Sequence, residues 1–99
     1  MKEIDEIINK LIENLPAFKE RYKIKSIGVF GSHVRGEELE DSDIDVLIEV
    51  GRGVTLFQFL ALERELSELL GKKVDLVSKR ALKPLIGKHI LEEVIYVLN

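Results

Sequence analysis

The stretch from Gly31 to Val50, GSHVRGEELEDSDIDVLIEV, decides the fold that this sequence predicts. A Gly-Ser pair follows one apolar run, and ten residues later Asp43-Ile44-Asp45 opens a second one. Side chains two apart on a strand project from the same face, about 7 Å apart along the chain, so Asp43 and Asp45 are expected to project together. Neighbouring carboxylates repel each other unless a cation lies between them. The pattern therefore predicts a phosphate-binding turn beside a two-carboxylate metal site.

Magnesium and a nucleoside triphosphate together would account for these residue types. Mg²⁺ prefers oxygen ligands and is typically held by one or two carboxylates and the phosphates of the substrate. A Gly followed by Ser at a strand-to-helix turn offers backbone N–H groups, a hydroxyl and the positive end of a helix. Because Gly31 has no Cβ, a phosphate can approach its backbone closely. Gly31 and Ser32 are therefore candidate phosphate ligands, and Asp43 and Asp45 are candidate metal ligands.

Size and composition predict a single folded domain over residues 1–99. The hydrophobic content of 45% argues against disorder, and this length can bury one core. The 15 basic and 18 acidic side chains give a net charge of −3, which predicts no general nucleic-acid binding. The chain has no cysteine and no apolar run near the roughly 20 residues that a membrane span needs. We therefore expect a cytoplasmic protein that does not contact membranes.

Hydrophobic periodicity predicts helices alternating with strands around one sheet, which is a small α/β domain. Gly28, inside the first strand, predicts a place where another backbone or a ligand comes close. A capping box at Thr55 and Gln58 predicts the start of a helix whose inner stripe includes Leu56. The expected elements are a helix over residues 2–15 ended by Pro16, strands over 25–30, 43–50 and 73–78, helices over 55–70 and 84–92, and 94–98, where a strand is favoured over a prolonged helix.

A third carboxylate, Asp75, lies on the strand expected over residues 73–78. Its neighbours are apolar, and an unpaired charge in such surroundings is costly. On a strand next to the first two carboxylates it would bind a second metal ion or accept the proton of an attacking hydroxyl. The alternative is a structural Asp bonded to the backbone or to Lys72 or Lys73.

Arg35 and His33 lie in the interval between the two motifs. Arg35 either contacts a phosphate or braces the acidic loop through Glu37 or Asp41. His33 is expected to be a surface or stacking histidine rather than a metal ligand.

The combination of these motifs resembles the minimal nucleotidyltransferases of the DNA polymerase beta superfamily. The resemblance spans nearly the whole chain, although relatives often have Tyr-Ala where this chain has His33-Val34. It implies a nucleotidyltransferase (polymerase beta-like) fold, with a small mixed sheet flanked by helices. The matching residues are Gly31-Ser32, Arg35-Gly36, Asp43-x-Asp45 and the Asp75 of Val-Asp-Leu-Val.

The resemblance also implies roles for these residues. Gly31 and Ser32 would hold the triphosphate of ATP, and Arg35 is grouped with them as nucleotide-binding. Two Mg²⁺ ions would be held by the three carboxylates, and Asp75 would also be a candidate general base. An acceptor hydroxyl would attack the α-phosphorus, take up AMP and release pyrophosphate. The residues in the catalytic and metal-binding group are Asp43, Asp45 and Asp75.

A domain of this length has no spare residues for an acceptor site, so the acceptor is expected on a partner. Similar stand-alone proteins are antitoxins of HEPN toxins, and some adenylylate a tyrosine of the toxin. The resemblance therefore implies a HEPN-type toxin partner and an oligomer formed with it. Two alternatives remain: an idle antitoxin that acts by binding alone, and a transferase for a small molecule. The apolar segment around Ile95, Tyr96 and Val97 is expected on the partner surface.

Overall fold

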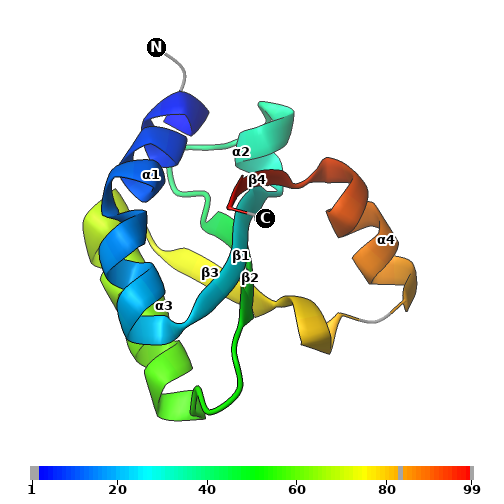
Figure 1. The fold of residues 1–99 in the computed structure, drawn as a ribbon. Helices are drawn as coiled ribbons and strands as arrows, with labels where there is room; N and C mark the ends of the chain where they lie inside the picture. The colour runs from blue at the N-terminus through cyan, green and yellow to red at the C-terminus, as the bar shows by residue number, and fades with distance from the viewer. Residues whose placement is uncertain (1–2, 83, 99) are drawn as a thin grey trace.

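A four-stranded mixed sheet organises the fold of this chain (Figure 1). The structure is a computed structural model that describes residues 3–82 and 84–98. The strand order is β3-β2-β1-β4, in which β2 and β3 are parallel and the other neighbours are antiparallel. The elements are α1 (Glu3–Tyr22), β1 (Ile24–Phe30), α2 (Ser32–Arg35), β2 (Ile44–Val50), α3 (Leu56–Leu70), β3 (Val74–Ser78), the 3₁₀ helix η1 (Lys79–Ala81), α4 (Pro84–Glu93) and β4 (Ile95–Leu98). The expected mixed α/β architecture is confirmed.

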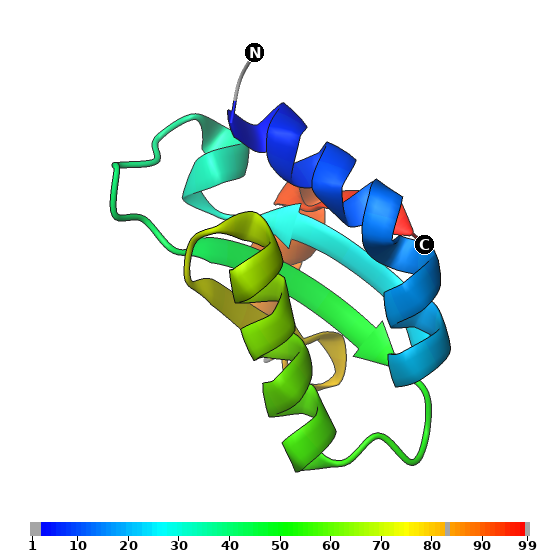
Figure 2. The same ribbon diagram turned by 90° about the vertical axis from the view of Figure 1, so that its left-hand side faces the viewer.

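Two helices cover one face of the sheet and leave the other face more open. Figure 2 shows α1 and α3 crossing the same side of the strands. Ile44, Val46 and Ile48 of β2 belong to the core beneath these helices. Because strand side chains alternate between faces, Asp45 projects from the opposite face. Nothing among the described helices combines the length and apolar character needed to cross a membrane.

The first helix is longer than the sequence predicts. Pro16 lies inside α1 and does not end it. A proline in a helix interior costs about 3 kcal/mol, because it removes a hydrogen bond and clashes with the preceding turn. Beyond Pro16, Phe18 and Tyr22 are buried in the core, and Arg21 pairs with Glu65 of α3 at 2.7 Å. This packing offsets the cost of Pro16.

The helix α3 begins with the predicted capping box. The Thr55 hydroxyl accepts from the Gln58 backbone N–H, and the Gln58 side chain accepts from the Thr55 N–H. Leu56, expected on the inner stripe, is instead 70% exposed. The first turn of α3 projects past the end of β2 (Figures 1 and 2), so only residues further along reach the core. The buried residues of α3 are Leu62, Leu66 and Leu70.

Candidate active site

Parallel pairing of β2 with β3 places two of the predicted carboxylates next to each other. Asp45 is directly opposite Asp75 in the ladder, and adjacent strands lie about 4.8 Å apart. The residues that flank Asp75, Val74 and Leu76, belong to the core. Asp75 therefore projects from the same open face as Asp45.

Asp43 lies one residue before β2 and outside the strand in which it was expected. Its side chain is 45% exposed, and its Oδ2 lies 3.9 Å from Nζ of Lys73. Asp75 makes no ion pair within residues 3–82 and 84–98. The alternative in which Lys72 or Lys73 pairs with Asp75 is therefore not seen, since these lysines pair with Glu3 and Asp43. The three carboxylates thus lie at the same ends of two parallel strands.

The environment of Asp45 opposes ionisation of its carboxyl group. Burial raises its pKa above the usual value, and the charges of Asp75 and Asp43 raise the pKa further, against smaller opposing effects of His33 and Arg35. A half-buried carboxylate beside others is stabilised by a bound proton or a cation. This arrangement has the electrostatic character expected of a metal ligand.

The carboxylates nevertheless do not form a complete metal cage by themselves. In the part of the chain that the structure describes, no three His, Cys, Asp or Glu side chains are arranged to hold a metal ion together. Mg²⁺ does not require such a cage, because it keeps several waters and takes further oxygens from substrate phosphates. Asp45, together with the neighbouring carboxylates whose charges it experiences, fits that donor set.

The turn after β1 is built around Gly31, which lies against Asp45. Gly31 has φ +85°, a backbone conformation that favours glycine. A Cβ at this position would overlap the Asp45 carboxylate and lie 2.9 Å from its Cγ. The Gly31 carbonyl accepts hydrogen bonds from the N–H groups of Val34 and Arg35, which starts α2. Only glycine lets the turn and the carboxylate meet this closely.

Glu93, the last residue of α4, also belongs to this site and was not predicted. Its Oε2 accepts from the Gly31 N–H at 3.1 Å, and its Oε1 accepts from Nη1 of Arg35 at 2.6 Å. Arg35 also donates from Nε to Glu37 at 3.2 Å, so the predicted bracing contact is present. The hydrogen bond to Glu93 raises the pKa of Arg35. In the sequence, Glu93 follows another acid at a helix end, and nothing marks it as different from a solvated residue.

His33 is buried, which corrects the expectation of a surface or stacking histidine. Its Nε2 lies 3.7 Å from Oε1 of Glu3, which also pairs with Lys72 at 2.7 Å. Within the described residues, neither ring nitrogen of His33 has a hydrogen-bond partner. The short helix α2 packs against α1, and this contact, which the local sequence does not encode, encloses the ring.

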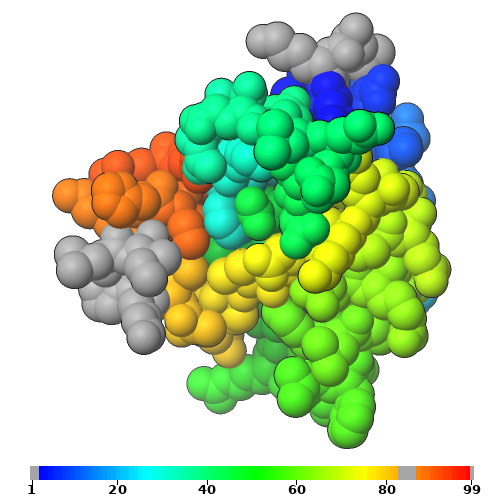
Figure 3. All heavy atoms as spheres, turned by 180° about the vertical axis from the view of Figure 1, so that it is seen from behind, coloured from blue at the N-terminus to red at the C-terminus, as the bar shows by residue number. Residues whose placement is uncertain are grey.

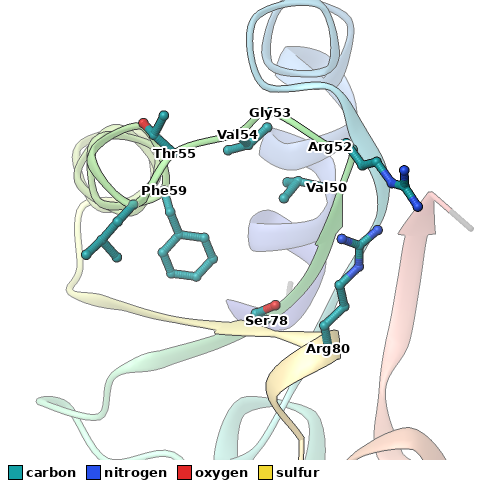
Figure 4. A pocket seen from close by; sticks show the side chains of 10 residues that line it. Val50, Arg52, Gly53, Val54, Thr55, Phe59, Ser78 and Arg80 are labelled. Carbon is teal, nitrogen blue, oxygen red and sulfur yellow. The ribbon is translucent and has the colours of Figure 1, made fainter.

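The open face of the sheet is hollowed at this site. Figure 3 views the molecule from behind, with β3 (yellow) towards the viewer, and shows parts of β1 and β2 at the floor of a hollow bordered by α2, β3 and α4. A cavity of about 500 Å³ lies at the other ends of β2 and β3 (Figure 4). Among the described residues, no acidic side chain lines that second cavity, so it offers no carboxylate ligand for a metal ion. The carboxylate end of the sheet is therefore the candidate active site.

Comparisons with known proteins agree with this fold. The family model of the nucleotidyltransferase domain matches residues 11–97. A protein adenylyltransferase, MntA of Thermococcus cleftensis, is 45% identical over 97 residues, which are 98% of each chain.

Solved structures show the same relationship. One described as a candidate minimal nucleotidyltransferase has a TM-score of 0.76 at 36% identity, covering 96% of this chain and 95% of that chain. A complex of tri-AMPylated Shewanella oneidensis HEPN toxin with MNT antitoxin has a TM-score of 0.63 at 22% identity, covering 100% of this chain and 73% of that chain, and shares the fold. From the domain match, the identity to its relatives and the shared fold, the chain belongs to the nucleotidyltransferase domain family.

Proposed function

We propose that this protein transfers AMP from Mg²⁺-ATP to a hydroxyl group of a partner protein. The expected acceptor is a tyrosine of a HEPN-type toxin, which would make the chain an antitoxin. The observation that carries the proposal is the register of β2 and β3, which sets Asp45 beside Asp75 and against Gly31. The name of the Thermococcus relative and the modified toxin in the Shewanella complex support the choice of reaction and partner.

The residues of the site would have separate roles in adenylyl transfer. Asp43 and Asp45 would hold Mg²⁺, and Asp75 would complete a site for a second ion. The bound metal would neutralise charge on the phosphates and orient them. Ser32 would bind phosphate, and this role is supported by its N–H and hydroxyl, which have no hydrogen-bond partner within the described residues.

The reaction forms one bond to phosphorus and breaks another. The acceptor oxygen attacks the α-phosphorus of ATP, and the bond to the bridging oxygen of the leaving pyrophosphate breaks. Asp75 is exposed and makes no ion pair within the described ranges, so it is available to take the proton of the acceptor hydroxyl. Most of the rate enhancement would come from positioning and charge neutralisation.

The competing proposal is an antitoxin that acts by binding alone. Asp45 argues against it, because burial and two neighbouring carboxylates make its charge unfavourable without a cation. A protein that only binds its partner would gain nothing from keeping this destabilising charge. Transfer to a small molecule is the third alternative, and nothing in the described geometry favours it.

Labelling of the partner tests the proposal directly. The protein is incubated with Mg²⁺, α-labelled ATP and the product of the adjacent gene as the proposed toxin, and modified residues are located by mass spectrometry. We expect AMP on a toxin tyrosine with the natural protein, and none with Asp43→Asn or Asp45→Asn. Asp41→Asn, an exposed residue of the same acidic loop, is the matched control and should retain transfer. A stable complex without any label would establish the binding-only alternative.

A further inference from the structure

We infer that Glu93 is a positioning residue that holds the turn from Gly31 to Arg35 in the geometry needed for transfer. One carboxylate accepts from two groups of this turn, at 3.1 Å from the Gly31 N–H and 2.6 Å from Arg35. The contacts stand on the structure alone, whereas the effect on catalysis rests on the proposed function. Glu93 lies 62 residues from Gly31 in sequence, so it couples α4 to the turn after β1.

The Gly31 backbone is fixed on both sides by these contacts. Its N–H, in a buried residue, would lack a partner without Glu93, and a buried donor left without a partner is unfavourable. Its carbonyl is held by the N–H groups of Val34 and Arg35. Glycine has more backbone freedom than any other residue, so these contacts decide how the next residue, Ser32, is presented. Fixing that orientation before the substrate arrives is the kind of preorganisation that transfer reactions depend on.

Glu93 also sets the position of Arg35. The guanidinium donates to two carboxylates, to Glu93 at 2.6 Å and to Glu37 at 3.2 Å. Without Glu93, the exposed Glu37 alone would hold Arg35. Glu93 therefore restrains the Arg35 end of the turn as well as its Gly31 end.

The same contacts admit a second interpretation, in which the Glu93 carboxylate occupies donors that a phosphate would take. Displacement by a phosphate would leave Glu93, whose side chain is only 20% exposed, without its two partners. A carboxylate largely removed from water and left unpaired is strongly unfavourable. Burial thus favours a residue that stays in place when substrate binds.

Three variants test the inference. Glu93→Ala removes the acceptor, Glu93→Gln keeps an oxygen that can accept from the Gly31 N–H, and Glu92→Ala is the control on the exposed neighbour. We expect Glu93→Ala to lower kcat of AMP transfer about 10- to 100-fold, the range typical of a misplaced turn, with a smaller change in KM for ATP. Glu93→Gln should recover most of the activity, and Glu92→Ala should match the natural protein. A fall in kcat that Gln does not recover would contradict positioning through this hydrogen bond.

Two further measurements separate the possible failures. Tighter ATP binding by Glu93→Ala with kcat unchanged would show that the carboxylate competes with the triphosphate, and would overturn the inference. If the natural protein transfers no AMP, the proposed function fails, but hydrogen exchange at the Gly31 amide still tests the contact. Exchange should be faster in Glu93→Ala than in Glu92→Ala, and equal rates would show that Glu93 does not hold the turn.

Discussion

At the scale of single residues, Asp45 is placed where its charge costs stability. It is half-buried, with Asp75 and Asp43 close enough to raise its pKa. In the absence of divalent metal, the ionised carboxylate opposes folding at neutral pH. We therefore expect Asp45→Asn to unfold at a higher temperature than the natural protein in EDTA. Relief worth about 1 kcal/mol would raise Tm by roughly 4–8 °C in a domain of this size.

Mg²⁺ should reverse the order of stability, because it stabilises the natural protein and has a weaker site in the variant. Thermal unfolding with and without Mg²⁺ measures both effects. Asp41→Asn removes an exposed acid of the preceding loop and should leave Tm unchanged in either condition. A lower Tm for Asp45→Asn in EDTA would mean that the carboxylate makes favourable contacts in the metal-free fold.

Part of the candidate site could be predicted because it follows from local periodicity. Because side chains alternate along a strand, Asp45 was predicted on the face of the sheet that points away from Ile44 and Val46 of the core. The same alternation places Asp75 on that face, between Val74 and Leu76. Glu93 and the burial of His33 could not be predicted, since each depends on a helix packed against a distant segment of the chain. Short-range rules identify which side chains share a face, whereas tertiary packing decides their partners.

At the scale of elements, the pairing of β4 with β1 depends on Gly28. The sequence predicted a close approach at this glycine, and the structure confirms it with the backbone of β4. A Cβ on Gly28 would lie 2.6 Å from Cγ2 of Val94 and 2.8 Å from the Ile95 carbonyl oxygen. Backbone cannot move aside as a side-chain end can, so Gly28→Ala should lower the free energy of unfolding by about 1–3 kcal/mol.

Urea unfolding measures the effect of Gly28→Ala. Lys25→Ala, at an exposed position of the same strand, is the control and should change stability by less than about 0.5 kcal/mol. Equal stability of Gly28→Ala and the natural protein would show that β4 can move away at little cost. Glu93 lies two residues before β4, so loss of the pairing between β1 and β4 should also weaken the hydrogen bond from the Gly31 N–H to Glu93.

The predicted elements agree with the structure where local rules dominate, and fail where packing overrides them. The capping box of α3 and the strand over 95–98 follow from turn chemistry and β-branched composition. Pro16 and Leu56 were misjudged for opposite reasons. Buried contacts carry α1 through its proline, while α3 begins beyond the sheet and leaves an apolar side chain in water.

At the scale of the whole molecule, the two ends of the sheet differ in chemistry. One end carries the carboxylates of the candidate active site. The other end has the 500 Å³ cavity of Figure 4, where Phe59 and Val50 point inward and the guanidinium groups of Arg52 and Arg80 lie on the side away from α3. Neither arginine takes part in an ion pair within the described residues. This end therefore combines apolar side chains with two positive charges.

The exposed side chains at the start of α3 extend this apolar surface, with Phe57 85% and Leu60 50% exposed, more than the 40% of Ile95 on β4. Exposed apolar patches of this kind mark protein interfaces. We expect Phe57→Asp to weaken binding of the proposed HEPN-type partner at least tenfold, measured by calorimetry, while leaving Tm unchanged because the Phe57 side chain is largely exposed. Arg64→Asp, an exposed position on the same helix, is the matched control and should bind normally. Unchanged binding by Phe57→Asp would exclude the start of α3 as the partner-binding surface. The segment around Ile95 would then be the expected interface.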